Sequence, residues 1–238
     1  FDPNTEKFIR FYHKDANPAS LSNDKIWSVL ADSHGQVWIG TDNGFNRFIE
    51  NTRSFKNYLP DARNPFSMKG KSVNAIIEDG KYLWLANWGE GLNKFDVVTN
   101  RFYNYKQAFL PSEKNPNDLW AAVKGDDGKI WVGSYWKGLY QFDPAAKTFP
   151  HFDNPLNPQK PVFTLLNLKD NKLLVGDSES FWWFNIAAKT WEKITGADND
   201  PHGHAYLDES GMVWISAKNG LSKIDHRQNK FDFYPFDK

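Results

Sequence analysis

The 238-residue sequence contains no cysteine, no excess of charge of either sign and no long apolar run. Without cysteine it has no disulfide framework, no cysteine-ligated zinc and no thiol nucleophile. This absence does not fix the compartment, because extracytoplasmic proteins need not carry disulfides. With 29 basic and 29 acidic residues the net charge is zero. Such a balance provides no electrostatic attraction for nucleic acid or an anionic membrane, so we expect no nucleic-acid partner.

Apolar runs such as Phe181-Trp182-Trp183-Phe184 are far shorter than the roughly 20 residues that a membrane-spanning helix needs. The first residues lack the basic start and apolar stretch of a signal peptide, and there is no initiator methionine. We therefore expect the sequence to be a piece of a longer protein. Aromatic residues, by contrast, make up 16% of the chain, which is typical of a folded protein and not of a disordered one.

A repeat of 40–47 residues organises the sequence. One short motif recurs around Trp38, Trp84, Trp131, Leu174 and Trp214, at spacings of 46, 47, 43 and 40 residues. A second series of aromatic residues follows the same period: Phe8, Phe55, Phe102, Phe149, Trp191 and Phe231. Two independent series with one period indicate a structural repeat.

Each repeat contains four short strand-like runs, and no segment shows a sustained helical period. The pattern predicts an all-β fold, a β-propeller with one four-stranded antiparallel blade per repeat. The aromatic-x-x-aromatic pattern of the fourth runs breaks strict alternation, which indicates either a β-bulge or a strand end.

We expect residues 1–238 to form a single propeller segment of five complete units plus one partial unit. The expected blades cover residues 26–58, 73–105, 119–152, 162–194 and 202–234. Residues 1–12 would be the end of an upstream blade, with its fourth strand at Phe8–Tyr12. The segment would then be part of a larger propeller, and a closed five-bladed ring is the alternative.

The repeat resembles the two-component regulator propeller repeat. The motifs that carry the resemblance are GQVWIGTDNGFNRF (35–48), LWLANWGEGLNKFD (83–96) and IWVGSYWKGLYQFD (130–143). The fourth unit departs most, with Leu174 in place of tryptophan and Ser180 in place of glycine. Such repeats are typical of the extracytoplasmic sensor region of hybrid two-component systems in Bacteroidetes. The resemblance implies a sensor role, often for oligosaccharides, with a β-sandwich domain, a membrane span and a kinase elsewhere in the protein.

The acidic residues of the turns are the first candidates for catalysis. Asp32, Asp126, Asp127, Asp208 and Glu209 recur in hairpin turns, where aspartate bonds the backbone and glycine supplies a positive φ. We therefore interpret them as turn-forming residues. Glu90 and Asp177 break the repeat pattern and are freer candidates, but a glycosidase needs two carboxylates that face one bond. We predict no catalytic residue.

Aromatic residues outside the packing positions are the main binding candidates. The tryptophans of the second strands should pack between blades. Others fall where a first strand begins or between the second and third strands: Trp27, Trp88, Trp120, Tyr135 and Trp136. In propellers these places share one face with the loops between blades, which are long here. Rings there can stack on sugars while nearby Asn, Asp and Lys bond hydroxyl groups.

His202 and His204 complete the set of ligand-binding candidates. They form the only close histidine pair and would share one face of a strand. They could instead be two polar residues at the entry of an inner strand. Because no third ligand is identifiable, we predict no metal site, and we expect no cofactor.

These observations favour the ligand-sensing propeller of a hybrid histidine kinase sensor, with an oligosaccharide or other small ligand on the loop-rich face. Any kinase activity would lie outside this chain. The expected partners are neighbouring blades or a sandwich domain of the same protein and a second protomer, and the expected location is the periplasmic part of a membrane-anchored sensor. The alternatives are a propeller polysaccharide lyase or hydrolase and a protein-interaction scaffold.

Overall fold

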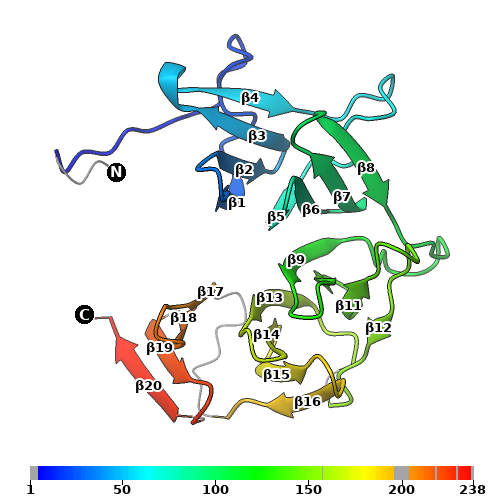
Figure 1. The fold of residues 1–238 in the computed structure, drawn as a ribbon, viewed down its shortest axis with the longest axis vertical. Helices are drawn as coiled ribbons and strands as arrows, with labels where there is room; N and C mark the ends of the chain where they lie inside the picture. The colour runs from blue at the N-terminus through cyan, green and yellow to red at the C-terminus, as the bar shows by residue number, and fades with distance from the viewer. Residues whose placement is uncertain (1–4, 157, 196–203, 218, 229, 237–238) are drawn as a thin grey trace. The chain divides into compact units, whose positions relative to one another are not determined.

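A computed structural model describes residues 5–156, 158–195, 204–217, 219–228 and 230–236. Within these ranges the chain forms twenty β-strands, one short 3-10 helix, η1 (Glu50–Thr52), and no α-helix. The strands form five antiparallel sheets of four strands, each built from consecutive strands (Figure 1). The predicted all-β fold with four-stranded antiparallel blades is confirmed. The described residues include no helix long and apolar enough to cross a membrane.

The bounds of the strands follow the repeat. The first sheet contains β1 (Ile26–Ala31), β2 (Val37–Thr41), β3 (Gly44–Ile49) and β4 (Ser54–Tyr58). The second contains β5 (Val73–Asp79), β6 (Tyr82–Asn87), β7 (Gly91–Asp96) and β8 (Arg101–Tyr105). The third contains β9 (Leu119–Lys124), β10 (Ile130–Ser134), β11 (Gly138–Phe142) and β12 (His151–Phe152). The fourth contains β13 (Val162–Asn167), β14 (Lys172–Asp177), β15 (Phe181–Asn185) and β16 (Thr190–Lys193). The fifth contains β17 (Ala205–Leu207), β18 (Val213–Ala217), β19 (Gly220–Asp225) and β20 (Lys230–Pro235).

The chain divides into two compact units. The N-terminal unit comprises residues 1–88 and 92–104, and the C-terminal unit comprises residues 89–91 and 105–238. In the first, β1 lies beside β5, and in the second, β13 lies beside both β9 and β17 (Figure 1). The inner strands approach closely: a Cβ on Gly133 of β10 would lie 2.7 Å from the carbonyl oxygen of Val162. Glycine is required there because no side chain fits between the sheets.

Two tryptophans of the second strands lie in the core between sheets, as predicted. Trp38 and Trp131 are fully buried, each against the third strand of the next sheet in its unit. A long polar side chain opposes each of them across the hairpin, Arg47 opposite Trp38 and Gln141 opposite Trp131. The large apolar indole is buried between the sheets, and the long polar side chain lies beside it on the neighbouring strand. This arrangement accounts for the recurrence of tryptophan in the second strands.

The fourth sheet reverses this arrangement. Leu174 occupies the tryptophan position, and its cross-strand partner is Trp183. Both are buried in the cluster between the fourth and fifth sheets. The tryptophan of this pair stands on the third strand, a leucine stands on the second, and the face remains filled. The departure of this unit from the repeat motif is thus a volume-conserving exchange.

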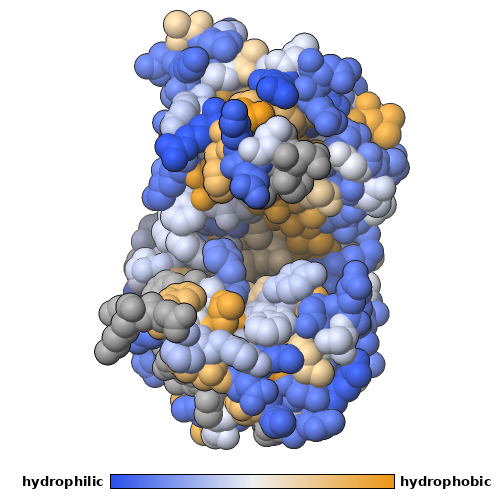
Figure 2. Space-filling view, turned by 90° about the vertical axis from the view of Figure 1, so that its left-hand side faces the viewer, coloured by the Kyte–Doolittle hydropathy of each residue, from blue (hydrophilic) through white to orange (hydrophobic). Residues whose placement is uncertain are grey.

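The fourth strands pair with their third strands in a regular register. In β4, Phe55 opposes Phe48 and Tyr58 opposes Phe45, with no shift between them. The bulge alternative for the aromatic-x-x-aromatic pattern is therefore wrong for this sheet. Residues 8–12, which we expected to form a fourth strand, lie outside the twenty strands. Figure 2 shows apolar residues exposed among hydrophilic ones on the side of the molecule that it presents.

Candidate functional site

The first strands carry β-bulges at one repeated position. In the first sheet the register shifts between Ile26 and Ser28, so Trp27 is the extra residue. The same shift leaves Trp120 extra in β9 and Phe163 extra in β13. A bulge turns a side chain away from the alternation of its strand. The repeat thus presents an aromatic ring at the start of three of its inner strands.

In the C-terminal unit these rings gather into one aromatic cluster, which consists of Trp120, Tyr135, Trp136 and Phe163. Trp120 and Phe163 pack edge-to-face with ring centroids 5.7 Å apart. Tyr135, in the turn after β10, contacts both, at 6.1 Å from Trp120 and 5.7 Å from Phe163. Trp136 packs on Tyr135 at 4.5 Å. All four rings are partly exposed, so the cluster presents apolar ring surface to solvent.

Polar groups surround Trp136. Its indole Nε1 donates a 2.7 Å hydrogen bond to Oδ2 of Asp118. The other carboxylate oxygen of Asp118 accepts from the amide of Asn115 at 3.2 Å. The Lys114 ammonium lies 4.4 Å from the centroid of the Trp136 ring. The cluster thus has an apolar body with an ammonium group, an amide and a carboxylate at its edge, as small-molecule sites do.

Asp118 is buried, with a relative exposure of 6%. Burial raises the pKa of its carboxyl above the usual value, although the indole of Trp136 and the backbone N–H of Gly89 act in the opposite direction. The side chain holds Trp136 in position through the indole hydrogen bond. Asp118 is therefore a positioning group for the aromatic cluster.

Trp27 and Trp88 belong to the N-terminal unit. The indole of Trp27 donates a 3.0 Å hydrogen bond to Asp42, and the Lys25 ammonium lies 4.3 Å from its ring centroid. Trp88 is 38% exposed, and its backbone N–H donates to the carbonyl oxygen of Ser72 at 3.4 Å. Because of the bulge, Trp27 has the same position in the first sheet as Trp120 has in the third. An ammonium group lies beside the ring of Trp27, as another does beside the ring of Trp136.

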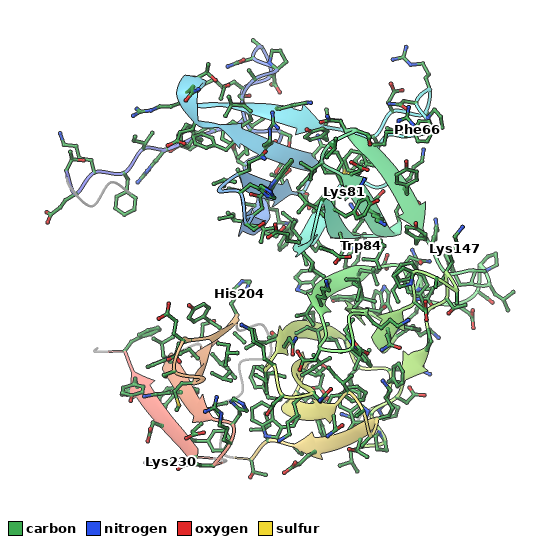
Figure 3. The ribbon with its side chains drawn as sticks, in the orientation of Figure 1. Phe66, Lys81, Trp84, Lys147, His204 and Lys230 are labelled. Atoms are coloured by element: carbon green, nitrogen blue, oxygen red, sulfur yellow. The ribbon has the colours of Figure 1, made fainter. Side chains whose placement is uncertain are left out.

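The predicted histidine pair is only partly described, because His202 lies outside the described residues. His204 precedes β17 and is exposed, and its side chain projects away from its own sheet (Figure 3). Its backbone N–H donates to Oγ of Ser216 at 2.9 Å. Within the described part of the chain, no three His, Cys, Asp or Glu side chains converge to hold a metal ion.

The carboxylates of the turns are engaged in hydrogen bonds of the fold. Asp32 accepts from the backbone N–H groups of His34 and Gln36, which confirms its turn-forming role. Asp177, the freer candidate, is 3% exposed and accepts from the indole of Trp182 at 2.7 Å. Glu90 pairs with the ammonium of Lys106 at 3.2 Å. These carboxylates hold turns and tryptophans in place.

Sequence reasoning missed two members of the site, Phe163 and Asp118. Phe163 aligns with Trp27 and Trp120 at the start of an inner strand, so the repeat alignment contained the signal. For Asp118 no signal was available beyond its place at the end of a long loop. Its burial and its bond to Trp136, eighteen residues later, depend on how the turn after β10 folds back.

Comparison with known proteins identifies the repeat. Residues 20–43, which include β1 and β2, match the model of the two component regulator propeller family. No protein of curated function matches the sequence. The matched segment contains Trp27 and Trp38, the bulge residue and the packing residue of the first sheet.

Several solved structures share the fold. The extracellular domain of the hybrid two component system BT3049 from B. thetaiotaomicron matches 89% of this chain and 30% of its own, with a TM-score of 0.74 and 24% identity. The extracellular domain of the one component system BT4673 from the same organism matches 98% of this chain and 33% of its own, with a TM-score of 0.76 and 22% identity. This chain thus spans about a third of their length.

A structure of streptogramin B lyase matches 92% of this chain and 71% of its own, with a TM-score of 0.69 and 16% identity. At such identities these likenesses concern the fold alone. The chain carries the two component regulator propeller repeat at residues 20–43 and has the fold of the extracellular domains of B. thetaiotaomicron two-component systems.

Proposed function

We propose that this chain is the ligand-binding part of an extracytoplasmic two-component sensor and that it binds an oligosaccharide at the aromatic cluster. The observation that carries the proposal is the convergence of Trp120, Tyr135, Trp136 and Phe163 around partly exposed ring surface. The repeat match at residues 20–43 and the fold of sensor extracellular domains support the sensor role.

Carbohydrate recognition suits the chemistry of the cluster. A pyranose has an apolar C–H face that packs on an aromatic ring, and equatorial hydroxyl groups that need hydrogen-bond partners. The rings of Trp120 and Tyr135 supply the apolar surface, and the ammonium group of Lys114 supplies a donor. Loss of a stacked tryptophan should cost on the order of 2 kcal/mol, or about thirtyfold in affinity.

Signal transfer then needs a neighbour that responds to the bound sugar. A ligand shifts a conformational equilibrium only if it binds one state more tightly than the other. The neighbour would be a further blade or sandwich domain of the same protein, or a second protomer. The sensor would be anchored in the membrane, with this chain in the periplasm and the kinase on the far side of the membrane.

An enzyme is the second candidate. Asp118 favours it, because burial raises the pKa of a carboxyl that lies beside a partly exposed aromatic cluster. The fold of streptogramin B lyase adds a catalytic precedent among similar folds. A lyase or hydrolase would cleave the bound sugar, whereas a sensor would bind it without cleavage.

One experiment separates the two candidates. The thermal unfolding of the chain is measured with plant, host and microbial oligosaccharides, and each sample is then analysed for cleavage. A ligand at a hundred times its dissociation constant should add roughly 2.7 kcal/mol of stability. A shift without cleavage supports the sensor, and a shift with cleavage supports the enzyme. No shift with any sugar contradicts carbohydrate binding by this chain.

Variants locate the site. Trp120→Ala should weaken the affinity for the sugar about thirtyfold. Phe66→Ala, which removes a partly exposed ring in the N-terminal unit, is the matched control and should leave the affinity unchanged. Equal effects of the two substitutions would place the sugar away from the aromatic cluster.

A further inference from the structure

The N-terminal unit contains a groove of about 620 Å³ that shares no residue with the aromatic cluster. Three segments form it: the loop of residues 13–22, the turn between β2 and β3, and β4 with the residue that follows it, Leu59. Small-molecule sites in proteins have volumes of about 300–1,000 Å³. The groove is therefore large enough for a ligand of its own.

Hydrogen bonds fix the loop that forms one wall of this groove. The Oγ of Ser20 donates to the carbonyl oxygen of Asn17 at 2.7 Å and accepts from the backbone N–H of Lys14 at 2.9 Å. From β4, the side-chain amide of Asn57 donates to the carbonyl oxygens of Pro18 and Ser20 at 3.1 and 2.9 Å. The groove is thus preformed, and a ligand would not have to order it.

The next repeat shows why this groove is open. There, Phe66 of the loop and Tyr103 of β8 pack edge-to-face, with centroids 6.1 Å apart and an interplanar angle of 69°. The shared Asn-Pro-x-Ser motif aligns Phe66 with Ala19, and the shared aromatic residue of the fourth strands aligns Tyr103 with Lys56. Both Ala19 and Lys56 line the groove. A methyl group and a flexible chain thus replace two rings in contact, which leaves space between the loop and β4.

A second pair of positions differs in the same way. Glu90 and Lys106 form an ion pair at 3.2 Å. Their equivalents in the first repeat are Asn43, which also stands directly before the glycine that begins a third strand, and Leu59, which also follows the last aromatic residue of a fourth strand. Asn43 and Leu59 line the groove and cannot form an ion pair. Four departures from the repeat therefore line one groove, which indicates a role other than packing.

The charged side chains that line the groove are mostly basic. They are the ammonium groups of Lys14 and Lys56, the imidazole of His13 and the carboxylate of Asp15. The ring of His13 bonds the carbonyl oxygen of Leu21 at 2.7 Å and the Asp15 carboxylate at 2.9 Å, and these two acceptors raise the pKa of His13. The groove therefore favours an anion.

Uncharged groups of the groove complete its chemistry. The side chain of Asn43 is exposed, and the buried Oδ1 of Asn57 has no hydrogen-bond partner among the described residues. The ammonium of Lys56 donates to Oδ1 of Asn100 at 2.9 Å and keeps further N–H groups for a ligand. Leu59, which is 48% exposed, adds a small apolar surface. Ammonium groups suit a carboxylate, and side-chain amides suit hydroxyl groups.

We propose that this groove binds a small hydroxylated carboxylic acid of the sugar-acid type. The carboxylate of the ligand lies against the ammonium groups of Lys14 and Lys56. Its hydroxyl groups meet the amides of Asn43 and Asn57, and its apolar edge packs on Leu59. An acidic peptide would supply the carboxylate without the hydroxyl groups that the amides suit. The proposal is independent of what the aromatic cluster binds.

The test compares two ligands that differ at one carbon. D-glucuronic acid carries a carboxylate where D-glucose carries a hydroxymethyl group. Each is titrated into the chain at neutral pH, and the backbone amide NMR signals of Ala19, Asn43 and Asn57 are followed. Glucuronate should shift these signals in a saturable manner. Its affinity should exceed that of glucose about fivefold, because only the carboxylate forms an ion pair with lysine.

Three variants of the chain test the location. Ala19→Phe introduces the ring that the next repeat carries, so it should abolish the shifts and leave the Tm unchanged. Lys14→Gln should lower the affinity for glucuronate about fivefold and leave that for glucose unchanged. Lys71→Gln removes an exposed lysine of the same unit outside the groove, and as the matched control it should change neither affinity. If Ala19→Phe does not fold, Lys14→Gln still tests the proposal.

Three outcomes would overturn the proposal. Equal affinities for glucuronate and glucose, or no shift with either, would mean that the groove does not recognise a carboxylate. Shifts that persist in a folded Ala19→Phe variant would place the ligand elsewhere. Tighter binding of a tetraglutamate peptide than of glucuronate would assign the groove to an acidic protein segment. Trp120→Ala should leave the shifts unchanged, so the result stands apart from sugar binding at the aromatic cluster.

Discussion

The indole Nε1 of Trp214 donates a 2.8 Å hydrogen bond to Oδ2 of Asp208, which lies in the turn that precedes the tryptophan's strand. The same relationship joins Trp38 to Asp32 at 2.8 Å, Trp84 to Asp79 at 3.2 Å and Trp131 to Asp127 at 3.2 Å. One carboxylate thus accepts the tryptophan N–H in each of these four sheets, and the indoles of Trp38 and Trp131 are fully buried against the next sheet of their unit. The repeat therefore couples a turn residue to a core residue.

Removal of one such carboxylate should destabilise the fold. Asp32→Ala leaves the indole N–H of the fully buried Trp38 without its acceptor, so the free energy of unfolding should fall by about 2 kcal/mol. Asp32→Asn retains an oxygen acceptor and should cost less. Urea unfolding followed by tryptophan fluorescence measures both. Equal costs for the two variants would mean that the indole hydrogen bond contributes little.

The stability of the chain should fall in acid. Hydrogen bonds from the Ser210 hydroxyl, the Trp214 indole and the Met212 backbone N–H lower the pKa of Asp208. A lowered folded-state pKa gives stability that is present above the unfolded value of about 3.9 and is lost as the pH falls through the folded value. Urea midpoints measured from pH 7 to pH 2 should therefore drop below about pH 4. Asp208→Asn should flatten this drop, and Glu209→Gln, in the same turn, should not.

Asp118 should show the opposite dependence. Burial raises the pKa of its carboxyl, so the folded state binds a proton more tightly than the unfolded state. Its contribution to stability is then present below the unfolded pKa and is lost as the pH rises through the folded pKa. Asp118→Asn keeps an acceptor for the indole of Trp136. Its free energy of unfolding should rise relative to that of the wild type as the pH rises from about 4 to about 7, since the unfolded-state pKa of aspartate is about 3.9. Thermal unfolding at several pH values measures this, and a constant difference would contradict it.

Close approach of the inner strands makes Gly133 sensitive to substitution. In Gly133→Ala the new methyl group would lie 2.7 Å from the carbonyl oxygen of Val162 and 2.8 Å from its Cβ. The sheets would have to move apart, at a cost of about 2 kcal/mol or more. Gly128→Ala is the control: its Cβ would meet open space, but its φ of +73° is unfavourable for alanine, which costs about 1 kcal/mol. A larger loss for Gly128→Ala in chemical denaturation would contradict close packing at Gly133.

Part of the candidate site could be predicted from the sequence. Trp120, Tyr135 and Trp136 stood out because they lie outside the packing positions of the repeat. Phe163 was missed, although it stands at the same bulged position of the repeat as Trp120. Its contact with Trp120 joins two inner strands that belong to different sheets. The alternation of side chains along a sequence predicts which face of a strand, and of its hairpin partner, each side chain occupies. It does not predict which side chains of a neighbouring sheet lie against that face.

The sequence by itself determined the repeat, the four strands of each unit and the burial of Trp38, Trp84 and Trp131 on the second strands. Those features follow from local chemistry: alternation, turn residues and one large apolar side chain at a fixed period. Only the tertiary structure decided that Trp183 fills the space beside Leu174 and that Asp118 holds Trp136. Each of these depends on volume and distance between segments far apart in the chain, which are set when the sheets pack.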